Sequence, residues 1–235
     1  MDFNNKKILV VVAHPDDELL GLGATMNKLI HDHNCNIRVV ILGEGLTSRS
    51  DKRDADKWSE ELNVHRQNIK VALKAIGFNS VGIYNFPDNR FDSIDLLDII
   101  KIVEKEKNEF QPEIIFTHHG GDLNIDHKRS FEAVITATRP LEKETVKAII
   151  SFETPSGTEW MASSDPNKFV PNLFVSVSEE NLNAKIKGME SYKYEKRKFP
   201  HPRSPEALKI IANRWGIMNG CEFAEAFCII RNIIN

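Results

Sequence analysis

The chain has 235 residues, of which 41% are hydrophobic and 28% are charged, and its formal net charge is -3. This composition is ordinary for a globular protein with one large domain and a substantial core. The slight acidic excess gives no basic footprint for nucleic acid, and no stretch of the sequence approaches the roughly 18 apolar residues of a membrane helix. We therefore predict neither a nucleic-acid partner nor a membrane span.

Cysteine usage and the N-terminal stretch bear on the location of the protein. The three cysteines, Cys35, Cys221 and Cys228, are an odd number without a CxxC pair, so we expect no disulfide framework and a reducing, cytoplasmic location. Two lysines precede the first apolar run, as in a signal peptide. That run passes directly into "HPDD" without a small-residue cleavage site, and we interpret it as a first strand.

Strand-like and helix-like segments alternate along the first two thirds of the chain. Residues 7–13 are continuously apolar, as expected for a parallel strand that is covered on both faces. The predicted order continues with helix 20–31, strand 37–42, helix 57–76, strand 81–86, helix 94–110, strand 113–117, helix 126–138 and strand 146–152. This βαβα alternation predicts an α/β, Rossmann-like fold, a mostly parallel sheet with helices on both faces.

The C-terminal part is predicted to be mainly helical. A strand over 173–177 precedes helices over 181–197 and 205–215, and a last strand is predicted over 227–231. Because no repeat, low-complexity tract or linker interrupts the sequence, we expect a single domain over 1–235, with 178–235 as a helical extension. The basic run "KYEKRK" over 193–198 is interpreted as a solvated helix face.

Residues that can bind a metal follow two of the predicted strands. In open parallel sheets, ligands bind beyond the carboxyl ends of the strands. The first strand is followed by "HPDDE" over 14–18, and the fourth by "HHGGDLNIDH" over 118–127. Five of the eight histidines fall in these stretches or in the later "HPRSP": His14, His118, His119, His127 and His201. This clustering favours a functional site over a random distribution of the histidines.

Imidazole and carboxylate groups are good ligands for a zinc-type ion, and a catalytic zinc needs about three protein ligands and one open position. His14 and Asp17 are three residues apart across a strand-to-helix turn, so both can face one point. His127, from a neighbouring strand end, would complete the set. The alternative is that the acidic residues 16–18 only favour the helix N-terminus through its dipole. The presence of two such stretches on one sheet favours a metal site over this alternative.

These stretches resemble the LmbE-like/PIG-L family of zinc-dependent N-deacetylases. The resemblance rests on "AHPDDE", on "GDLNIDH" and on the spacing between them, with support from "HRQNIKVALKAIG", "NFPD" and "CEFAEAF". It covers nearly the whole chain in the order of the family. It implies that His14, Asp17 and His127 hold Zn²⁺ or another divalent first-row metal, and that Asp16 is the general base toward a metal-activated water.

The reaction that the resemblance implies is hydrolysis of an N-acetyl group on an amino sugar, or on its glycoside or nucleotide conjugate. The chain departs from many members at Asn124, where they have a histidine that stabilises the oxyanion or protonates the leaving amine. Asn124 can donate a hydrogen bond but cannot act as an acid. We therefore name His201 as the candidate acid and His119 as the second choice.

Three further residues receive roles from the same resemblance. Arg66 and Asp88 match residues that contact sugar hydroxyls, although an exposed helix arginine and an ordinary turn aspartate are the alternatives. Asp126 is expected to orient a metal-binding imidazole or Asn124. The loops 47–56 and 154–171 are expected to select the sugar and its attached group.

Two other functions remain open. The same site can deacylate another N-acylated small molecule, or the chain can be a non-catalytic nucleotide-binding α/β domain. The latter requires a first turn that accepts phosphate, and the carboxylate-rich "HPDD" is a poor anion site. Because family members often form homo-oligomers, the C-terminal segment is a candidate surface for self-association.

Overall fold

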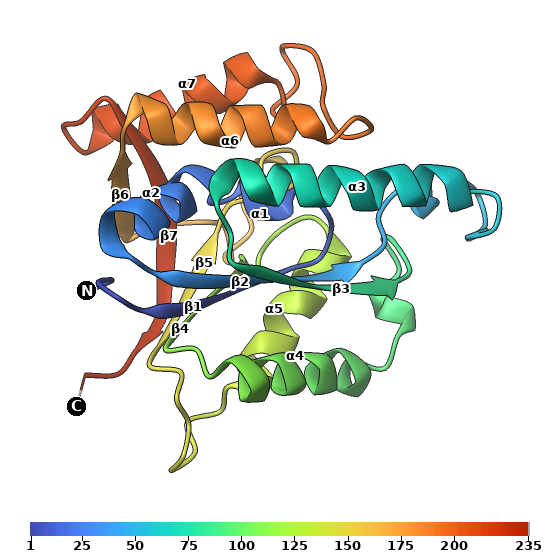
Figure 1. The fold of residues 1–235 in the computed structure, drawn as a ribbon, viewed down its shortest axis with the longest axis horizontal. Helices are drawn as coiled ribbons and strands as arrows, with labels where there is room; N and C mark the ends of the chain where they lie inside the picture. The colour runs from blue at the N-terminus through green and yellow to red at the C-terminus, as the bar shows by residue number, and fades with distance from the viewer. Residues whose placement is uncertain (235) are drawn as a thin grey trace.

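The computed structural model describes residues 1–234, which form one seven-stranded sheet between two layers of helices (Figure 1). The strand order is β3-β2-β1-β4-β5-β7-β6. The five parallel strands are β1 (Lys7–Val12), β2 (Asn36–Gly43), β3 (Ser80–Phe86), β4 (Ile114–His118) and β5 (Ala148–Phe152). The antiparallel strands are β6 (Leu173–Val177) and β7 (Phe223–Asn232). The predicted fold class, a mostly parallel Rossmann-like sheet, is confirmed.

Helices cover both faces of the sheet (Figure 1). One face carries α1 (Asp17–Leu20), α2 (Gly23–His33), α3 (Ser59–Ile76) and α6 (Glu179–Ser191), and α7 (Pro205–Met218) packs against β7. The other face carries α4 (Leu96–Phe110) and α5 (Ile125–Ala137). Three short 3₁₀ turns lie in the loops: η1 (Thr47–Arg49), η2 (Phe91–Ser93) and η3 (Thr158–Trp160).

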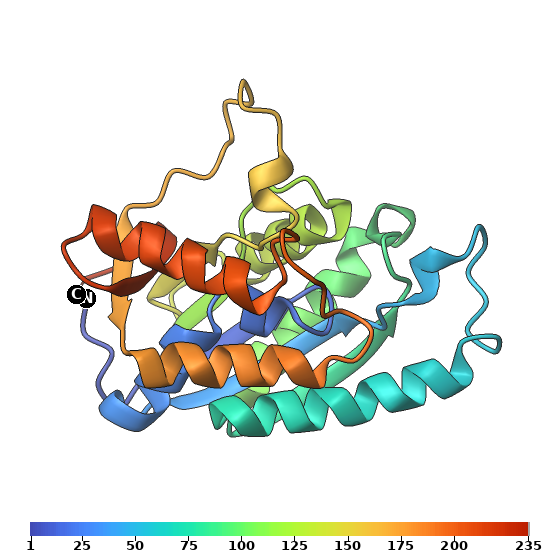
Figure 2. The ribbon, with the colours of Figure 1, turned by 90° about the horizontal axis from the view of Figure 1, so that it is seen from above.

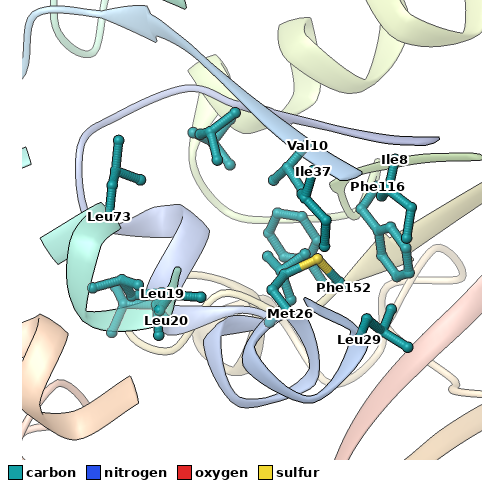
Figure 3. Close-up of a cluster of buried hydrophobic side chains, with 14 of the residues drawn as sticks. Ile8, Val10, Leu19, Leu20, Met26, Leu29, Ile37, Leu73, Phe116 and Phe152 are labelled. Atoms are coloured by element: carbon teal, nitrogen blue, oxygen red, sulfur yellow. The ribbon is translucent and has the colours of Figure 1, made fainter. Parts of the chain in front are cut away.

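Strand β1 is buried on both faces, as its unbroken apolar run predicts. Ile8 and Val10 pack into the core under α2 and α3 (Figure 3), whereas Leu9 and Val11 pack against α4 and α5. Successive side chains of a strand point to opposite faces, so each half of the run fills one core. The carboxyl end of β1 is thereby held between two packed layers.

The sheet order reverses at β1. The chain moves from β1 outward to β2 and β3, and then returns to place β4 and β5 on the other side of β1. Such a reversal opens a crevice at the carboxyl ends of the strands, where ligands bind in open α/β sheets. The turn "HPDD" follows β1 and the stretch "HGGDLNIDH" follows β4, so the two sequence motifs meet at this crevice.

Two predicted boundaries in the C-terminal part are wrong. Helix α6 ends at Ser191, and the basic run 193–198 lies in the loop that joins α6 to α7 (Figure 2) rather than on a helix face. The reason is a long-range contact: Tyr192 is fully buried and its hydroxyl donates to Oε1 of Glu18 at 2.5 Å, which draws the chain inward. Strand β7 begins at Phe223, earlier than predicted, and pairs with both β5 and β6.

Within residues 1–234, none of the helices combines the length and the apolar character that crossing a membrane requires.

Candidate metal centre

The turn after β1 has a strained backbone that neighbouring side chains support. Asp16 has φ of +110°, a region that residues other than glycine rarely occupy. Its N–H donates to Oε2 of Glu18 at 3.0 Å. One residue before the turn, the N–H of Ala13 donates to Nε2 of the fully buried His118 at 2.9 Å. Backbone strain that is held in this way is typical of functional sites.

This turn brings one carboxylate and two imidazoles together. The ligand atoms of His14, Asp17 and His127 lie within 4.8 Å of one another. Oδ2 of Asp17 is 3.4 Å from Nδ1 of His14 and 3.4 Å from Nε2 of His127. His127 is on the first turn of α5, just beyond β4. The three residues therefore come from the two strand ends that the sequence motifs indicated.

A further carboxylate contacts the outer nitrogen of each imidazole. Nε2 of His14 donates to Oδ2 of the fully buried Asp126 at 2.9 Å, which leaves Nδ1 to face Asp17. Nδ1 of His127 lies 3.1 Å from Oδ1 of Asp122 in an electrostatic contact, and its Nε2 faces Asp17. Such carboxylates fix the orientation of metal-binding histidines and make them better ligands.

The charges around the cluster favour a cation. Burial alone would lower the pKa of His127, but the carboxylates of Asp17 and Asp122 raise it to about 9. Burial likewise opposes ionisation of Asp17, yet the adjacent imidazoles hold its pKa well below the usual range. The cluster is therefore stabilised by positive charge, which a divalent ion supplies. Two imidazoles and one carboxylate with room for a further ligand match a catalytic zinc site, so the residues fit the metal.

Asp16 is separate from this cluster and points to a different partner. Its side chain is 2% exposed, and its Oδ2 accepts from Nη1 of Arg203 at 2.8 Å. Burial raises the pKa of the Asp16 carboxyl well above its ordinary value, and the Arg203 guanidinium opposes that rise. The same guanidinium donates from Nε to Oγ of Ser156 at 2.7 Å. Adjacent carboxylates thus have different environments: Asp17 faces the imidazoles, and Asp16 faces an arginine.

A cavity of about 240 Å³ opens beside these groups. Asp16 and His14 line this cavity. Five residues from other parts of the chain line it as well: Asp88, Asn124, Trp160, His201 and Arg203. Asn124 caps the N-terminus of α5, where its Oδ1 accepts from the N–H of Asp126 at 2.8 Å, and its Nδ2 donates to Asn89. His201 lies edge-to-face against Trp160, with ring centroids 5.8 Å apart.

The remaining predicted residues have different surroundings. Oδ1 of Asp88 is 3.4 Å from Nε2 of His14, and its Oδ2 accepts from the hydroxyl of Ser48 at 2.6 Å. Nε2 of His119 instead donates to the carbonyl of Asn167 at 2.7 Å, and His119 is absent from the cavity lining. Arg66 donates to Asn85 on the surface and also does not line the cavity. The structure therefore does not bring His119 or Arg66 to the cluster.

Three residues of the site were not assigned a role from the sequence. Arg203 lies two positions after His201 in "HPRSP", but nothing in that motif signals an ion pair with Asp16. Asp122 follows the two glycines of "HHGGD" and received no role in the sequence analysis. His118 was counted in the histidine cluster without a role, although its ring stacks on that of His127 with centroids 3.9 Å apart.

Comparison with known proteins gives three kinds of match. The family model PIG-L, described as GlcNAc-PI de-N-acetylase, matches residues 9–138, more than half of the chain. An uncharacterized deacetylase of Escherichia coli, YaiS, is 29% identical over 193 residues, which are 80% of this chain and 91% of YaiS. The diacetylchitobiose deacetylase of Thermococcus kodakarensis is 23% identical over 241 residues, 98% of this chain and 86% of that enzyme.

A solved structure of a deacetylase has a similar fold. The zinc-inhibited form of the teicoplanin deacetylase Orf2 superposes with a TM-score of 0.74, covering 97% of this chain and all of Orf2, at 15% identity. At that identity the match shows the fold alone.

Proposed function

Because the chain belongs to the PIG-L family of de-N-acetylases, we propose that it is a metal-dependent hydrolase that removes the acetyl group from an N-acetylated amino sugar, its glycoside or its nucleotide conjugate. The observation that carries this proposal is the separation of two adjacent carboxylates. Asp17 faces two imidazoles, while Asp16 lies in the cavity lining and is free of them. The relative named diacetylchitobiose deacetylase supports the reaction class.

In this proposal His14, Asp17 and His127 hold the metal, and Zn²⁺ is the ion that their chemistry favours. When bound, a divalent ion of this type lowers the pKa of a water and polarises the amide carbonyl. Asp126 and Asp122 keep the two imidazoles in the orientation that directs a nitrogen lone pair toward Asp17. The three free cysteines are consistent with the expected reducing, cytoplasmic location.

Asp16 is the proposed general base. It accepts a proton from the attacking water, whose oxygen adds to the acetyl carbonyl carbon. Asp16 then returns the proton to the sugar nitrogen as the C–N bond breaks, so that acetate and a free amine leave. A carboxyl whose pKa is raised by burial holds an accepted proton more readily than an exposed one, which suits this double role. Asp16 can thus supply the acid function that Asn124 lacks.

The tetrahedral oxyanion needs hydrogen-bond donors. His201 and Asn124 both line the cavity and both carry N–H groups. Burial lowers the pKa of His201 below its ordinary value, and the neighbouring Arg203 adds to this, so His201 is neutral near pH 7. We assign it hydrogen-bond donation rather than proton transfer.

The test measures metal content and amine release together. Purified wild-type protein is expected to hold about one metal ion per chain and to release amine from N-acetylglucosamine or its short glycosides. We expect His127→Ala to lose the metal, Asp16→Ala to keep the metal without activity, and the control His31→Ala, at an exposed position, to behave as wild type. Metal without amine release from any acetylated sugar would favour another N-acyl substrate. No metal, even after zinc is supplied, would overturn the proposal.

A further inference from the structure

Three guanidinium groups surround one carboxylate at the mouth of the cavity. Oε1 of Glu195 accepts from Nη2 of Arg49 at 2.6 Å, and its Oε2 accepts from Nη1 of Arg203 at 2.9 Å. The Nη2 atom of Arg197 lies 3.9 Å from the same Oε2. Glu195 is 8% exposed, and all four residues line the cavity.

Two of these guanidinium groups donate hydrogen bonds to the same carbonyl oxygen. Nη2 of Arg49 donates to the carbonyl of Tyr194 at 3.0 Å, and Nη1 of Arg197 donates to the same carbonyl at 2.7 Å. Like charges repel, and within the described residues the carboxylate that contacts both groups is that of Glu195. Arg49 comes from η1 and Arg197 from the loop between α6 and α7, so the tertiary fold has brought the two together.

The charges of this group do not balance. Arg49, Arg197 and Arg203 carry three positive charges, while the carboxylates that contact them, Glu195 and Asp16, carry two negative charges. Arg203 is shared by both carboxylates and Arg49 is paired with Glu195. The surplus therefore lies at Arg197, because its contact with Glu195, at 3.9 Å, is the longest of the four ion pairs.

The two outer guanidinium groups are open to a ligand. The side chains of Arg49 and Arg197 are 35% and 39% exposed, in contrast to 2% for Asp16. A guanidinium has five N–H donors. Among residues 1–234, Nε and Nη1 of Arg49 and Nε of Arg197 donate no hydrogen bond. These N–H groups can each donate a charge-assisted hydrogen bond to an oxygen of a phosphate or a carboxylate.

An unpartnered histidine lines the same part of the cavity. His65 is 1% exposed, and within the described residues neither ring nitrogen has a hydrogen-bond partner. Burial lowers its pKa to about 4, and the charge of Arg49 adds to the effect. A neutral imidazole without a partner in a pocket wall is costly, and a ligand that supplies a hydroxyl or an anionic oxygen would satisfy it.

We propose that Arg49 and Arg197, with His65 beside them, form an anion subsite at the cavity mouth, and that the preferred substrate is an N-acetylated amino sugar bearing a phosphate or carboxylate group. The inference rests on the proposed deacetylase function. Arg203 contacts both Glu195 and Asp16, so the subsite is one side chain away from the proposed base. The carboxylates of Asp88 and Asp126 face His14 on the metal side, whereas Arg49 and Arg197 lie beside Glu195.

The first test is direct binding to metal-loaded wild-type protein, measured by calorimetry with compounds that cannot be hydrolysed. Glucosamine 6-phosphate and glucosamine 1-phosphate are compared with uncharged glucosamine, and muramic acid provides the carboxylate arm. We expect at least one charged compound to bind at least tenfold more tightly than glucosamine. Arg197→Gln and Arg49→Gln should each reduce this ratio severalfold or more, and Arg139→Gln, at an exposed position outside the cavity lining, should preserve it.

The second test is the ratio of kcat/KM for the corresponding N-acetylated sugars, and it separates this inference from the proposed function. Hydrolysis without any preference for charged substrates would overturn the anion subsite and leave the deacetylase function standing. A preference that survives in both arginine variants would mean that the anion binds the metal, which also overturns the subsite. Arginine-dependent binding of the charged amino sugars without hydrolysis of their acetylated forms would support the subsite and overturn the function.

Discussion

Nη1 of Arg203 donates to Oδ2 of Asp16 at 2.8 Å across a sequence separation of 187 residues. Asp16 lies directly after β1, whereas Arg203 belongs to the loop between α6 and α7. The same guanidinium binds Ser156 in the segment that follows β5 and Glu195 in its own loop. The C-terminal third of the chain therefore completes a site whose proposed metal ligands come from the first 127 residues.

Replacing Arg203 by glutamine is expected to reduce kcat at least tenfold and to leave the metal content unchanged. The substitution removes the positive charge and the hydrogen bond that position Asp16, and misplaced catalytic groups lose rate steeply. Amine release and metal analysis on the same preparation measure both effects. Arg203→Lys keeps the charge and should restore part of kcat. Loss of thermal stability with unchanged kcat in Arg203→Gln would reduce Arg203 to a structural role.

Asp126→Asn and Asp122→Asn are expected to weaken metal binding by about 10- to 100-fold. Each substitution removes the negative charge beside the outer nitrogen of one imidazole that we propose as a metal ligand. Competition with a chelator of known affinity measures the dissociation constant. Asp98→Asn on the exposed surface of α4 is the control. Wild-type affinity in both variants would argue that the two carboxylates do not support the ligands.

Much of the fold and part of the site follow from the sequence because they depend on local patterns. Strand β1 is recognisable from its unbroken apolar run, and the metal cluster from two motifs at neighbouring strand ends. The end of α6 depends instead on the contact between Tyr192 and Glu18, which are separated by 174 residues. The hydrophobic pattern near Tyr192 does not reveal that long-range contact, so the predicted helix was too long.

The histidine pair after β4 shows a similar limit. His118 is fully buried, where it accepts from the N–H of Ala13, while His119 binds the carbonyl of Asn167 in a surface loop. Neighbouring residues at a strand end point to opposite sides. Only one of the two can therefore face the site, and which one does so depends on how β4 pairs with β1. The choice of His119 as second candidate for the acid has no support from its position.

Gly21→Ala is expected to destabilise the protein by about 1 to 3 kcal/mol, the usual cost of overpacking. A Cβ at Gly21 would overlap the ring of Phe152, which is fully buried at the end of β5. Urea unfolding measures the loss. If the overlap is the cause, Phe152→Leu should reduce the cost of Gly21→Ala, so that the double variant is more stable than the sum of the single effects predicts. Additive effects would exclude the overlap as the cause.

Glu153 is expected to make stability depend on pH. Burial raises the pKa of this carboxyl from 4.5 to about 6, although the indole N–H of Trp215 donates to its Oε1 at 2.5 Å. Because the pKa is higher in the folded state than in the unfolded state, the folded protein binds the proton more readily. Its contribution to stability is therefore fully present below pH 4.5 and is lost as the pH rises through 6.

Glu153→Gln imitates the protonated form, since the amide oxygen can still accept from Trp215. We expect the variant to be more stable than wild type at pH 8 by about 1 to 2 kcal/mol, and to show little difference at pH 4.5, because one pKa unit corresponds to about 1.4 kcal/mol. Urea unfolding at both pH values measures the difference, with Glu142→Gln at an exposed position as the control. An equal effect of Glu153→Gln at the two pH values would show that the buried charge is not its source.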